Sequence, residues 1–479
     1  MTENQAPGES VSSTSHGFDN RVNAAAVPSR NPLAEESLTP PNWRTALVFF
    51  IFGLINNFAY VVFLSAAEDL LEKHAGAVLF ADVVPGLLVK VSLGFWFRGS
   101  AYGGLVAFVS VTGTLAFLLA AVCAERISVL ARVLLLVSIS FISIAGALGE
   151  ATFLALSAVY GSETLTGWSS GTGFAGVAGA ASYALLVSGL GWRPKTSLLA
   201  LAFAPLMIAA AYQCLPSPQY SWQVSRTSGT WRPMKAVSDA EMGSYSRGEV
   251  QYATTEAGVS GEPHRALLLQ LWRSFLLPLA LVYFAEYSIN QGVLPTFDGS
   301  PYFREVGSLD NAPASGDHGL YRRFQVIYQV AVFVSRSSIA VVRISRLWIF
   351  PVVQGMNLTL LSAAASGSRF FTKGFFSSRA IGCIVFLEGL LGGASYANTF
   401  WSIRHGTHPQ AREWALAVST VADAAGIAAA SVFASFLECR LLAAQGRACN
   451  GFLEGASARA YRERIETAAW KQSSLMYSS

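Results

Sequence analysis

Apolar segments, each about 20 residues long, recur along most of this chain. A helix of that length crosses the ~30 Å hydrocarbon core of a bilayer. Charged residues make up 13% of the sequence, whereas soluble domains carry about 25%. Backbone groups inside lipid must find their hydrogen bonds within the protein, and an α-helix provides them within one segment. The sequence therefore predicts an all-α polytopic membrane protein.

The apolar segments form two groups separated by a polar stretch. We expect an amino-terminal half of about six helices at 43–215, a polar inter-half loop at 216–265, and a carboxy-terminal half of about five helices at 266–440. About eleven spans in two halves is the outline of a major-facilitator-like fold, in which a site lies between the halves. The predicted spans are 45–66, 77–97, 102–123, 129–158, 169–190, 196–215, 270–294, 323–342, 347–366, 375–402 and 413–437.

Polar segments flank the two halves. Residues 1–42 are rich in Ser, Asn, Pro and Glu and have no periodicity, so we predict a disordered cytosolic tail. Residues 441–479 mix charged residues with aliphatic and aromatic ones, which predicts an amphipathic tail. Basic residues are spread almost evenly over both sets of loops, so the cytosolic assignment depends mainly on the long tail remaining untranslocated.

An acidic residue lies near the centre of one predicted span. Glu286 is about 12 residues into the apolar run Ser274–Leu294, or roughly 18 Å from its start. A carboxylate at that depth costs on the order of 2–3 kcal/mol or more unless other groups satisfy it. Asn290 and Gln291 follow one turn later, on or near the same face. Such a group marks a transport pathway or a binding site by default.

Other predicted spans also carry polar side chains. Several acids within one membrane bundle favour proton or ion coupling, because a desolvated carboxyl group exchanges protons closer to neutral pH. The alternative for each residue is a buried structural pair, or a long side chain that reaches the interface. These residues are Asn56, Asn57, Asp82, Lys90, Glu150, Arg336, Glu388, Asn398 and Asp423.

Several classes of function receive no support from the sequence. The net charge is only +4 and the basic residues are scattered, which argues against nucleic-acid binding. The five cysteines show neither a CxxC motif nor metal-ligand spacing, so we expect no metal and no cofactor. No nucleophile and base can be paired from the sequence, and we expect that the protein is not an enzyme.

A glycine stripe occupies the fifth predicted span. Gly173, Gly176 and Gly179 recur every three residues within an apolar helix. Small residues at this spacing let a neighbouring helix approach closely. A nucleotide-binding loop is excluded, because no strand precedes the stripe and it contains no lysine.

Six stretches together resemble the battenin family, the family of the Batten-disease protein. They occur in the family's order over about 45–440, so a chance match is very improbable. The stretches are Asn56–Ala67, Leu148–Leu156, Trp168–Gly173, Tyr283–Gly292, Ser335–Ser338 and Glu388–Phe400.

This resemblance implies a lysosomal, late endosomal or vacuolar membrane protein with a major-facilitator-like fold. It further implies export of glycerophosphodiesters as small-molecule substrates, a role in lysosomal pH homeostasis, and protons as possible coupling ions. Handling of basic amino acids is an alternative within the same family. A membrane trafficking or scaffold protein without a transport cycle is the alternative from another class.

The resemblance also suggests where a cavity lies. In major-facilitator-like folds the first, fourth, seventh and tenth spans line the cavity, and the richest polar stretches of this chain fall on those spans. They contribute Asn56 with Asn57, Glu150, Glu286 with Asn290 and Gln291, and Glu388 with Asn398. An anionic substrate needs a cation nearby, and we expect Arg336 to contact a phosphodiester, with Lys90 as the second candidate.

Overall fold

The computed structural model describes most of the chain from Asn42 onward. The described residues are 42–70, 75–97, 102–126, 128–216, 220–224, 231–235, 262–298, 300, 319–367, 378–407, 409–447 and 449. The predicted tails at 1–42 and 441–479 lie mostly outside these residues, as does most of the predicted loop at 216–265.

The amino-terminal half is a bundle of helices that run back and forth. Ser128 begins one of them, because its hydroxyl accepts a hydrogen bond from the Ala131 amide at 3.2 Å and satisfies a free donor of the first turn. The elements are α2 (Trp43–Leu70), α3 (Ala75–Trp96), α4 (Tyr102–Cys123), α5 (Val129–Ser157), α6 (Glu163–Ala184), the π-helix η1 (Leu185–Gly189), α7 (Pro194–Leu201) and α8 (Leu206–Gln213).

A proline inside α3 is accommodated by a neighbouring helix. Pro85 has no amide hydrogen and disturbs the helical ladder around it. The hydroxyl of Ser143, on α5, accepts from the Gly86 amide at 2.9 Å and donates to the Asp82 carbonyl. A side chain of α5 is thus inserted between two backbone groups of α3, which joins the helices at this depth.

The carboxy-terminal half contains helices that are more often interrupted by π- and 3₁₀-helical turns. Its membrane elements are preceded by a two-stranded antiparallel hairpin, β1 (Tyr220–Val224) with β2 (Trp231–Lys235), in the segment predicted as a loop. The helices are α9 (Glu262–Leu271), the π-helix η2 (Trp272–Leu276), α10 (Leu277–Ser288), the π-helix η3 (Ile289–Val293), the 3₁₀-helix η4 (Leu294–Phe297), α11 (Gly319–Ser337), the 3₁₀-helix η5 (Ser338–Ala340), α12 (Ile349–Ala365), α13 (Ser378–Gly406), α14 (Pro409–Ser419) and α15 (Val421–Ala444).

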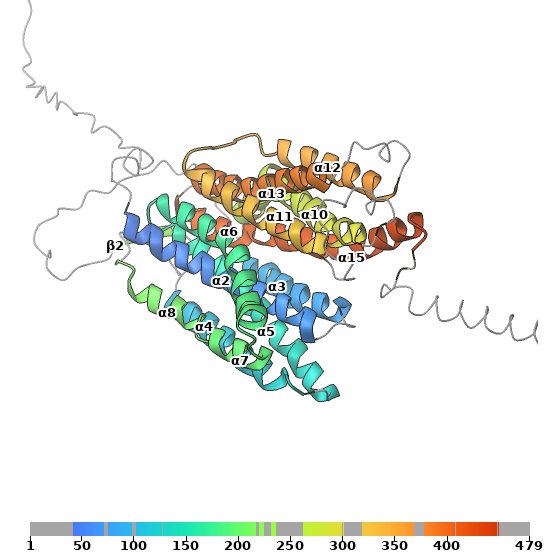
Figure 1. The fold of residues 1–479 in the computed structure, drawn as a ribbon. Coiled ribbons are helices and arrows are strands. Elements are labelled where there is room, and N and C mark those ends of the chain that lie inside the picture. The colour runs from blue at the N-terminus through green and yellow to red at the C-terminus, as the bar shows by residue number, and fades with distance from the viewer. Residues whose placement is uncertain are drawn as a thin grey trace, which may run out of the picture. The chain divides into compact units, whose positions relative to one another are not determined.

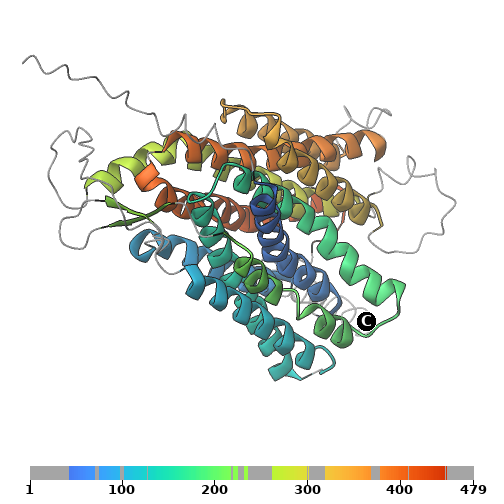
Figure 2. The same cartoon turned by 90° about the vertical axis from the view of Figure 1, so that its left-hand side faces the viewer.

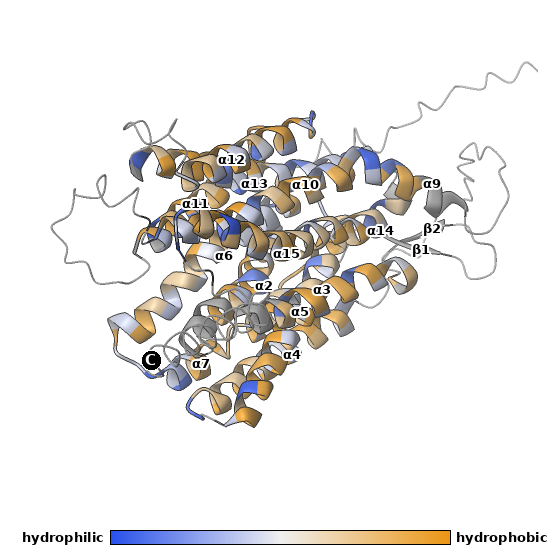
Figure 3. Cartoon of the chain, turned by 90° about the vertical axis from the view of Figure 1, so that its right-hand side faces the viewer, coloured by the Kyte–Doolittle hydropathy of each residue, from blue (hydrophilic) through white to orange (hydrophobic). Residues whose placement is uncertain are grey.

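Length and composition confirm the predicted polytopic fold. In the described part of the chain, 8 helical stretches are long and apolar enough to cross a membrane, and α12 is a shorter apolar helix. Apolar residues, coloured orange, predominate along the helices in Figure 3. Large apolar side chains point outward along the bundle, among them Phe95, which is 85% exposed, and Phe203, which is 71% exposed. Such a surface is suited to lipid and unsuited to water.

The two predicted halves are visible as two groups of helices. In Figures 1 and 2 the blue and green helices α2–α8 lie on one side and the yellow to red helices α10–α15 on the other. Between the groups α6 packs on α11, α5 packs on α14, and α3 packs on α15. We therefore expect a site shared by the two halves to involve these six helices or their neighbours.

The two ends of the bundle differ in how the halves are joined. Successive membrane-crossing stretches reverse direction, so the starts of α2, α4, α6 and α14 gather at one end, which we call the Trp43 end. The Tyr102 hydroxyl donates to Glu413 at 2.7 Å there, which connects α4 to α14. The apolar core near this end contains side chains of both halves, such as Leu156 and Trp414. Toward the opposite end each half has a core of its own.

The predicted glycine stripe allows α6 to pack against both halves. A Cβ atom on Gly173 would lie 2.9 Å from the Phe333 Cα of α11, and one on Gly176 would overlap the Gln329 side chain. A Cβ on Gly179 would lie 2.8 Å from Val61 of α2. The close helix approach predicted from the spacing is confirmed, and it holds α6 between α2 and α11.

Candidate functional site

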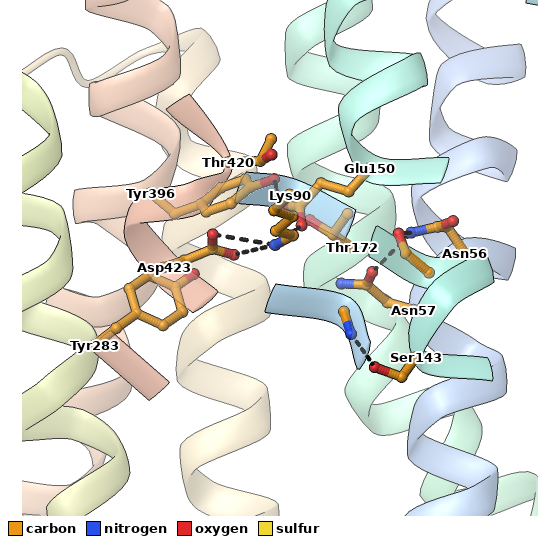
Figure 4. A network of polar contacts seen from close by, with 12 residues as sticks. Asn56, Asn57, Lys90, Ser143, Glu150, Thr172, Tyr283, Tyr396, Thr420 and Asp423 are labelled. Atoms are coloured by element: carbon orange, nitrogen blue, oxygen red, sulfur yellow. Dashed lines mark hydrogen bonds and ion pairs between the residues drawn. The ribbon is translucent and has the colours of Figure 1, made fainter. Parts of the chain in front are cut away.

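A buried lysine connects acids of the two halves. Lys90, on α3, places its Nζ 2.6 Å from a Glu150 carboxylate oxygen of α5 and 3.1 Å from one of Asp423 on α15 (Figure 4). All three side chains are at least 87% buried, since 7%, 13% and 8% of their surfaces are exposed. One cation thus serves two carboxylates. Removing either type of partner would leave a charge in a medium that solvates it poorly.

Aromatic side chains extend this ion network. The Tyr396 hydroxyl, on α13, donates to the second oxygen of Glu150 at 2.6 Å. The same hydroxyl accepts from the Trp168 indole nitrogen, on α6, at 3.0 Å. Both rings are almost completely buried. We call Lys90, Glu150, Asp423, Tyr396 and Trp168 the inter-half network, because its bonds cross between the halves three times.

Arg336 lies beside this network and is held by neutral groups. Its guanidinium donates to the Thr172 hydroxyl of α6 at 2.7 Å and to the Tyr283 hydroxyl of α10 at 3.0 Å. Its central carbon lies 4.3 Å from the centre of the Tyr396 ring, a cation–π contact. The Nε atom is buried without a hydrogen-bond partner among the described residues. No carboxylate of the described chain lies within ion-pair distance of Arg336, and Glu286 interacts with its charge only from beyond that distance.

A second acidic cluster lies within the carboxy-terminal half. The Asn290 amide donates to Glu388 at 2.8 Å and to the Glu286 backbone carbonyl at 3.1 Å. Gln325 donates to the Asn290 side-chain oxygen at 3.0 Å, and the Tyr328 hydroxyl donates to Glu286. We call these five residues the acid–amide cluster. They come from α10, η3, α11 and α13, all in one half.

The acid–amide cluster contains two acids and no cation. Glu286 is 3% exposed and Glu388 is 0% exposed. One oxygen of each carboxyl group is buried without a hydrogen-bond partner in the part of the chain that the structure describes. A Cβ atom on Gly392 would overlap the Glu286 carboxylate, so this glycine makes room for the acid. Ionising both acids here would be costly, because neither contacts a counter-charge among the described residues.

The remaining predicted site residues lie outside these two clusters. Asn56 donates to the Gly146 carbonyl at 3.1 Å and to Asn57 at 3.4 Å, which connects α2 to α5. Asn398 accepts from the Ile344 amide at 2.6 Å, and thereby holds the segment between α11 and α12. Gln291 is half-buried in η3. Gln291 and Asn398 are close along the chain to Asn290 and Tyr396, whereas Asn56 and Asn57 lie on α2, which carries no member of either cluster.

The model of the CLN3 protein family matches residues 47–444 of this chain. The chain belongs to the CLN3 protein family. Protein BTN1 of Yarrowia lipolytica is 37% identical over 393 residues, covering 81% of this chain and 92% of that protein. Battenin of Canis lupus familiaris is 32% identical over 429 residues, covering 82% and 90%. The predicted membership of the battenin family is confirmed.

Solved transporter structures resemble the CLN3-family chain more distantly. A Major Facilitator Superfamily transporter, FucP, in the outward conformation, aligns with a TM-score of 0.48 at 14% identity, over 84% of this chain and 97% of that one. The human organic anion transporter MFSD10 aligns with a TM-score of 0.49 at 12% identity, over 85% and 96%. These alignments are too weak to carry a conclusion about the mechanism of the CLN3-family chain.

Some residues of the inter-half network and around Arg336 were not predicted from the sequence. Tyr396, Trp168, Thr172 and Tyr283 all lie in stretches that carry the family resemblance, but an aromatic or hydroxyl residue inside a span is usually a packing residue. Asp423 stood out as an intramembrane acid, and its pairing with Lys90 joins positions 333 residues apart in the chain. Only the packing of α3 on α15 brings these two together.

A buried arginine at the Trp43 end was also not predicted. Arg404 is 0% exposed and belongs to α13, which extends to Gly406, beyond the predicted span. It donates to the carbonyl of Ser157 and to that of Tyr160 at 2.6 Å, at the end of α5. Burial raises the pKa of Tyr160 to about 12, so this hydroxyl remains protonated and donates to Pro216 at 2.9 Å. A cation of one half thus satisfies the free carbonyls of a helix end in the other.

Proposed function

We propose that this CLN3-family protein is a transporter that exports glycerophosphodiesters across a lysosomal or vacuolar membrane. The observation that carries the proposal is Arg336, a cation between the halves that is held by two hydroxyls and a ring. A phosphodiester carries one negative charge and presents acceptor oxygens to a guanidinium, which binds them in bidentate fashion. Neutral ligands are easily replaced by such an anion, whereas a carboxylate partner would compete with it.

The ligands of Arg336 suggest how binding is coupled to movement. Thr172 belongs to the amino-terminal half and Tyr283 to the carboxy-terminal half. An anion that takes the place of Thr172 on the guanidinium removes one of the bonds between the halves. Substrate binding therefore has a different free energy in the joined and the separated arrangement, which is what alternating access requires.

Proton coupling is assigned to the acid–amide cluster. No cation among the described residues contacts Glu286 or Glu388, so each gains most from carrying a proton while the cluster is buried. Exposure of the cluster during the cycle would release that proton, which would link substrate export to the pH of the compartment. Glu150 is the weaker candidate, because Lys90 already compensates its charge.

A transport assay tests the role of Arg336. Protein reconstituted in vesicles is supplied with radiolabelled glycerophosphocholine, and uptake is compared between the wild type, Arg336→Gln and Arg336→Lys. We expect Arg336→Gln to lower uptake by at least about tenfold, because a charge-assisted hydrogen bond contributes about 1.5–3 kcal/mol. Arg336→Lys should recover part of the loss. Arg193→Gln, at a site that is 82% exposed, is the matched control.

The proposal fails if Arg336→Gln transports at the wild-type rate while the protein is folded.

A basic amino acid is the second substrate class, since the two acids around Lys90 carry one negative charge more than the lysine balances. Competition by arginine or lysine at concentrations where glycerophosphocholine does not compete would favour that class. A fluorescent fusion observed together with a lysosomal or vacuolar marker tests the membrane assignment.

A further inference from the structure

A surface hollow lies between the starts of α10 and α12, away from both acidic clusters. Its volume is about 590 Å³. The lining combines two arginines and two serines with apolar side chains, and none of its residues belongs to the inter-half network or to the acid–amide cluster. The lining residues are Arg273, Ser274, Ser345, Arg346, Leu347, Trp348, Ile349, Val352 and Val353.

The charge of this hollow is positive and uncompensated. Arg273 comes from η2 and Arg346 from the segment that leads into α12. Among the residues that the structure describes, no acid lines the hollow. Neither arginine forms an ion pair with an acid in the described part of the chain. An anion in the hollow would therefore meet two cations that have no competing partner.

The position of the hollow corresponds to the membrane interface. α10 follows η2, and α12 begins at Ile349, so the hollow lies at the Trp43 end, where helices enter the membrane. Its outer apolar residues are strongly exposed: Trp348 by 48%, Ile349 by 49% and Val352 by 61%. Exposed apolar side chains on a membrane helix contact acyl chains, and a tryptophan at a helix start is typical of headgroup depth.

We propose that this hollow binds an anionic phospholipid. The lipid phosphate lies between Arg273 and Arg346, and the acyl chains run along Trp348, Ile349 and Val352. Basic pockets between membrane helices bind acidic headgroups in this way. A soluble phosphate would use the arginines alone, whereas the apolar wall is complementary to a molecule that carries both an anion and hydrocarbon chains.

The lipid would also stabilise a contact next to Arg336, the arginine proposed to bind the substrate. Leu347 lines the hollow and forms a small core with Phe350 and Val282. Val282 immediately precedes Tyr283, which is a ligand of Arg336. A lipid seated against Leu347 thus supports the packing of α12 on α10 behind that ligand.

Binding measurements on the purified full-length chain test the lipid site. Delipidated protein in a neutral detergent is titrated with dioctanoyl phosphatidylserine, dioctanoyl phosphatidylcholine and glycerol 3-phosphate. We expect phosphatidylserine to bind about tenfold or more tightly than phosphatidylcholine, because each basic residue near a headgroup adds to the affinity for an acidic lipid. Glycerol 3-phosphate, which has the anion without chains, should bind at least about tenfold more weakly than phosphatidylserine.

Variants separate this site from the substrate site. Arg273→Gln/Arg346→Gln should abolish the preference for phosphatidylserine, and each single variant should remove part of it. Arg193→Gln/Lys195→Gln removes two exposed basic residues that lie near Glu125, and should retain the preference. Arg336→Gln should also retain it. Unchanged preference in the Arg273→Gln/Arg346→Gln variant, or equal affinity for glycerol 3-phosphate and phosphatidylserine, overturns the proposal.

Discussion

The two buried acidic groups of this protein differ in what surrounds them. Glu150 and Asp423 share Lys90 and lie between the halves. Glu286 and Glu388 share an asparagine, have no cation in contact in the described structure, and lie within one half. Both groups are buried in a span and both contain carboxyl groups, so their sequence signals are alike. Because their surroundings differ, we expect the two groups to have different roles.

The difference indicates which acids we expect to stabilise the joined halves and which we propose to exchange protons. An acid beside a lysine is stable as an ion. Removing the acid leaves the lysine charge buried without a partner. An acid held only by amides and a hydroxyl is stable without its proton only if water reaches it. We therefore assign the inter-half network to joining the halves and the acid–amide cluster to coupling.

The largest expected effect comes from removing the shared cation. Lys90→Gln leaves Glu150 and Asp423 close together and buried without a counter-charge. Breaking a buried pair in this way costs about 3–5 kcal/mol. We expect a much lower thermal unfolding midpoint in detergent, measured by scanning fluorimetry, and a low yield of folded protein.

A matched change at the surface is the control for this prediction. Lys195→Gln removes a lysine that is 46% exposed and lies 3.8 Å from Glu125. Such pairs contribute only about 0–1 kcal/mol, so its midpoint should remain near that of the wild type. Adding Asp423→Asn to Lys90→Gln should restore part of the loss. Equal midpoints for Lys90→Gln and Lys195→Gln would refute the stabilising role of the network.

The next effect concerns proton coupling and separates the two acid groups. Glu286→Gln keeps the size of the side chain and its bond with Tyr328, but cannot carry a proton through the cycle. We expect the stimulation of glycerophosphocholine uptake by an imposed pH gradient to fall by about tenfold, a coupling loss of about 1.4 kcal/mol. Glu150→Gln should retain the dependence on the gradient and lose thermal stability instead.

Two outcomes would reverse this assignment. If Glu286→Gln retains full dependence on the gradient, the acid–amide cluster does not carry the coupled proton. If Glu150→Gln loses that dependence at an unchanged unfolding midpoint, the coupling belongs to the inter-half network. Uptake without a gradient, measured for both variants on the same preparations, corrects for differences in the amount of active protein.

The comparison also shows how far the sequence could predict this site. The depth of Glu286 in its span and the position of Asn290 one turn later both follow from helical spacing. In the structure the Asn290 side-chain amide donates a hydrogen bond to the Glu286 backbone carbonyl. The spacing of α6 glycines predicted close packing for the same reason. Periodicity within one helix reports which residues share a face. It does not report which other helix that face meets, so the pairing of Lys90 with Asp423 could not be predicted.

The smallest expected effects come from two tyrosines that serve the two groups. Tyr396→Phe removes the donor to Glu150 and the acceptor for Trp168, and leaves a buried indole N–H unpaired. The cost is about 1–3 kcal/mol of stability, with the dependence of uptake on the pH gradient unchanged. Tyr328→Phe removes the donor to Glu286, whose other carboxyl oxygen has no partner among the described residues, so it should also cost about 1–3 kcal/mol, while it alters the pH at which uptake is half-maximal. Scanning fluorimetry and uptake at several pH values distinguish the two variants. If both tyrosine variants change the pH dependence equally, the two groups act as one proton pathway across the interface between the halves.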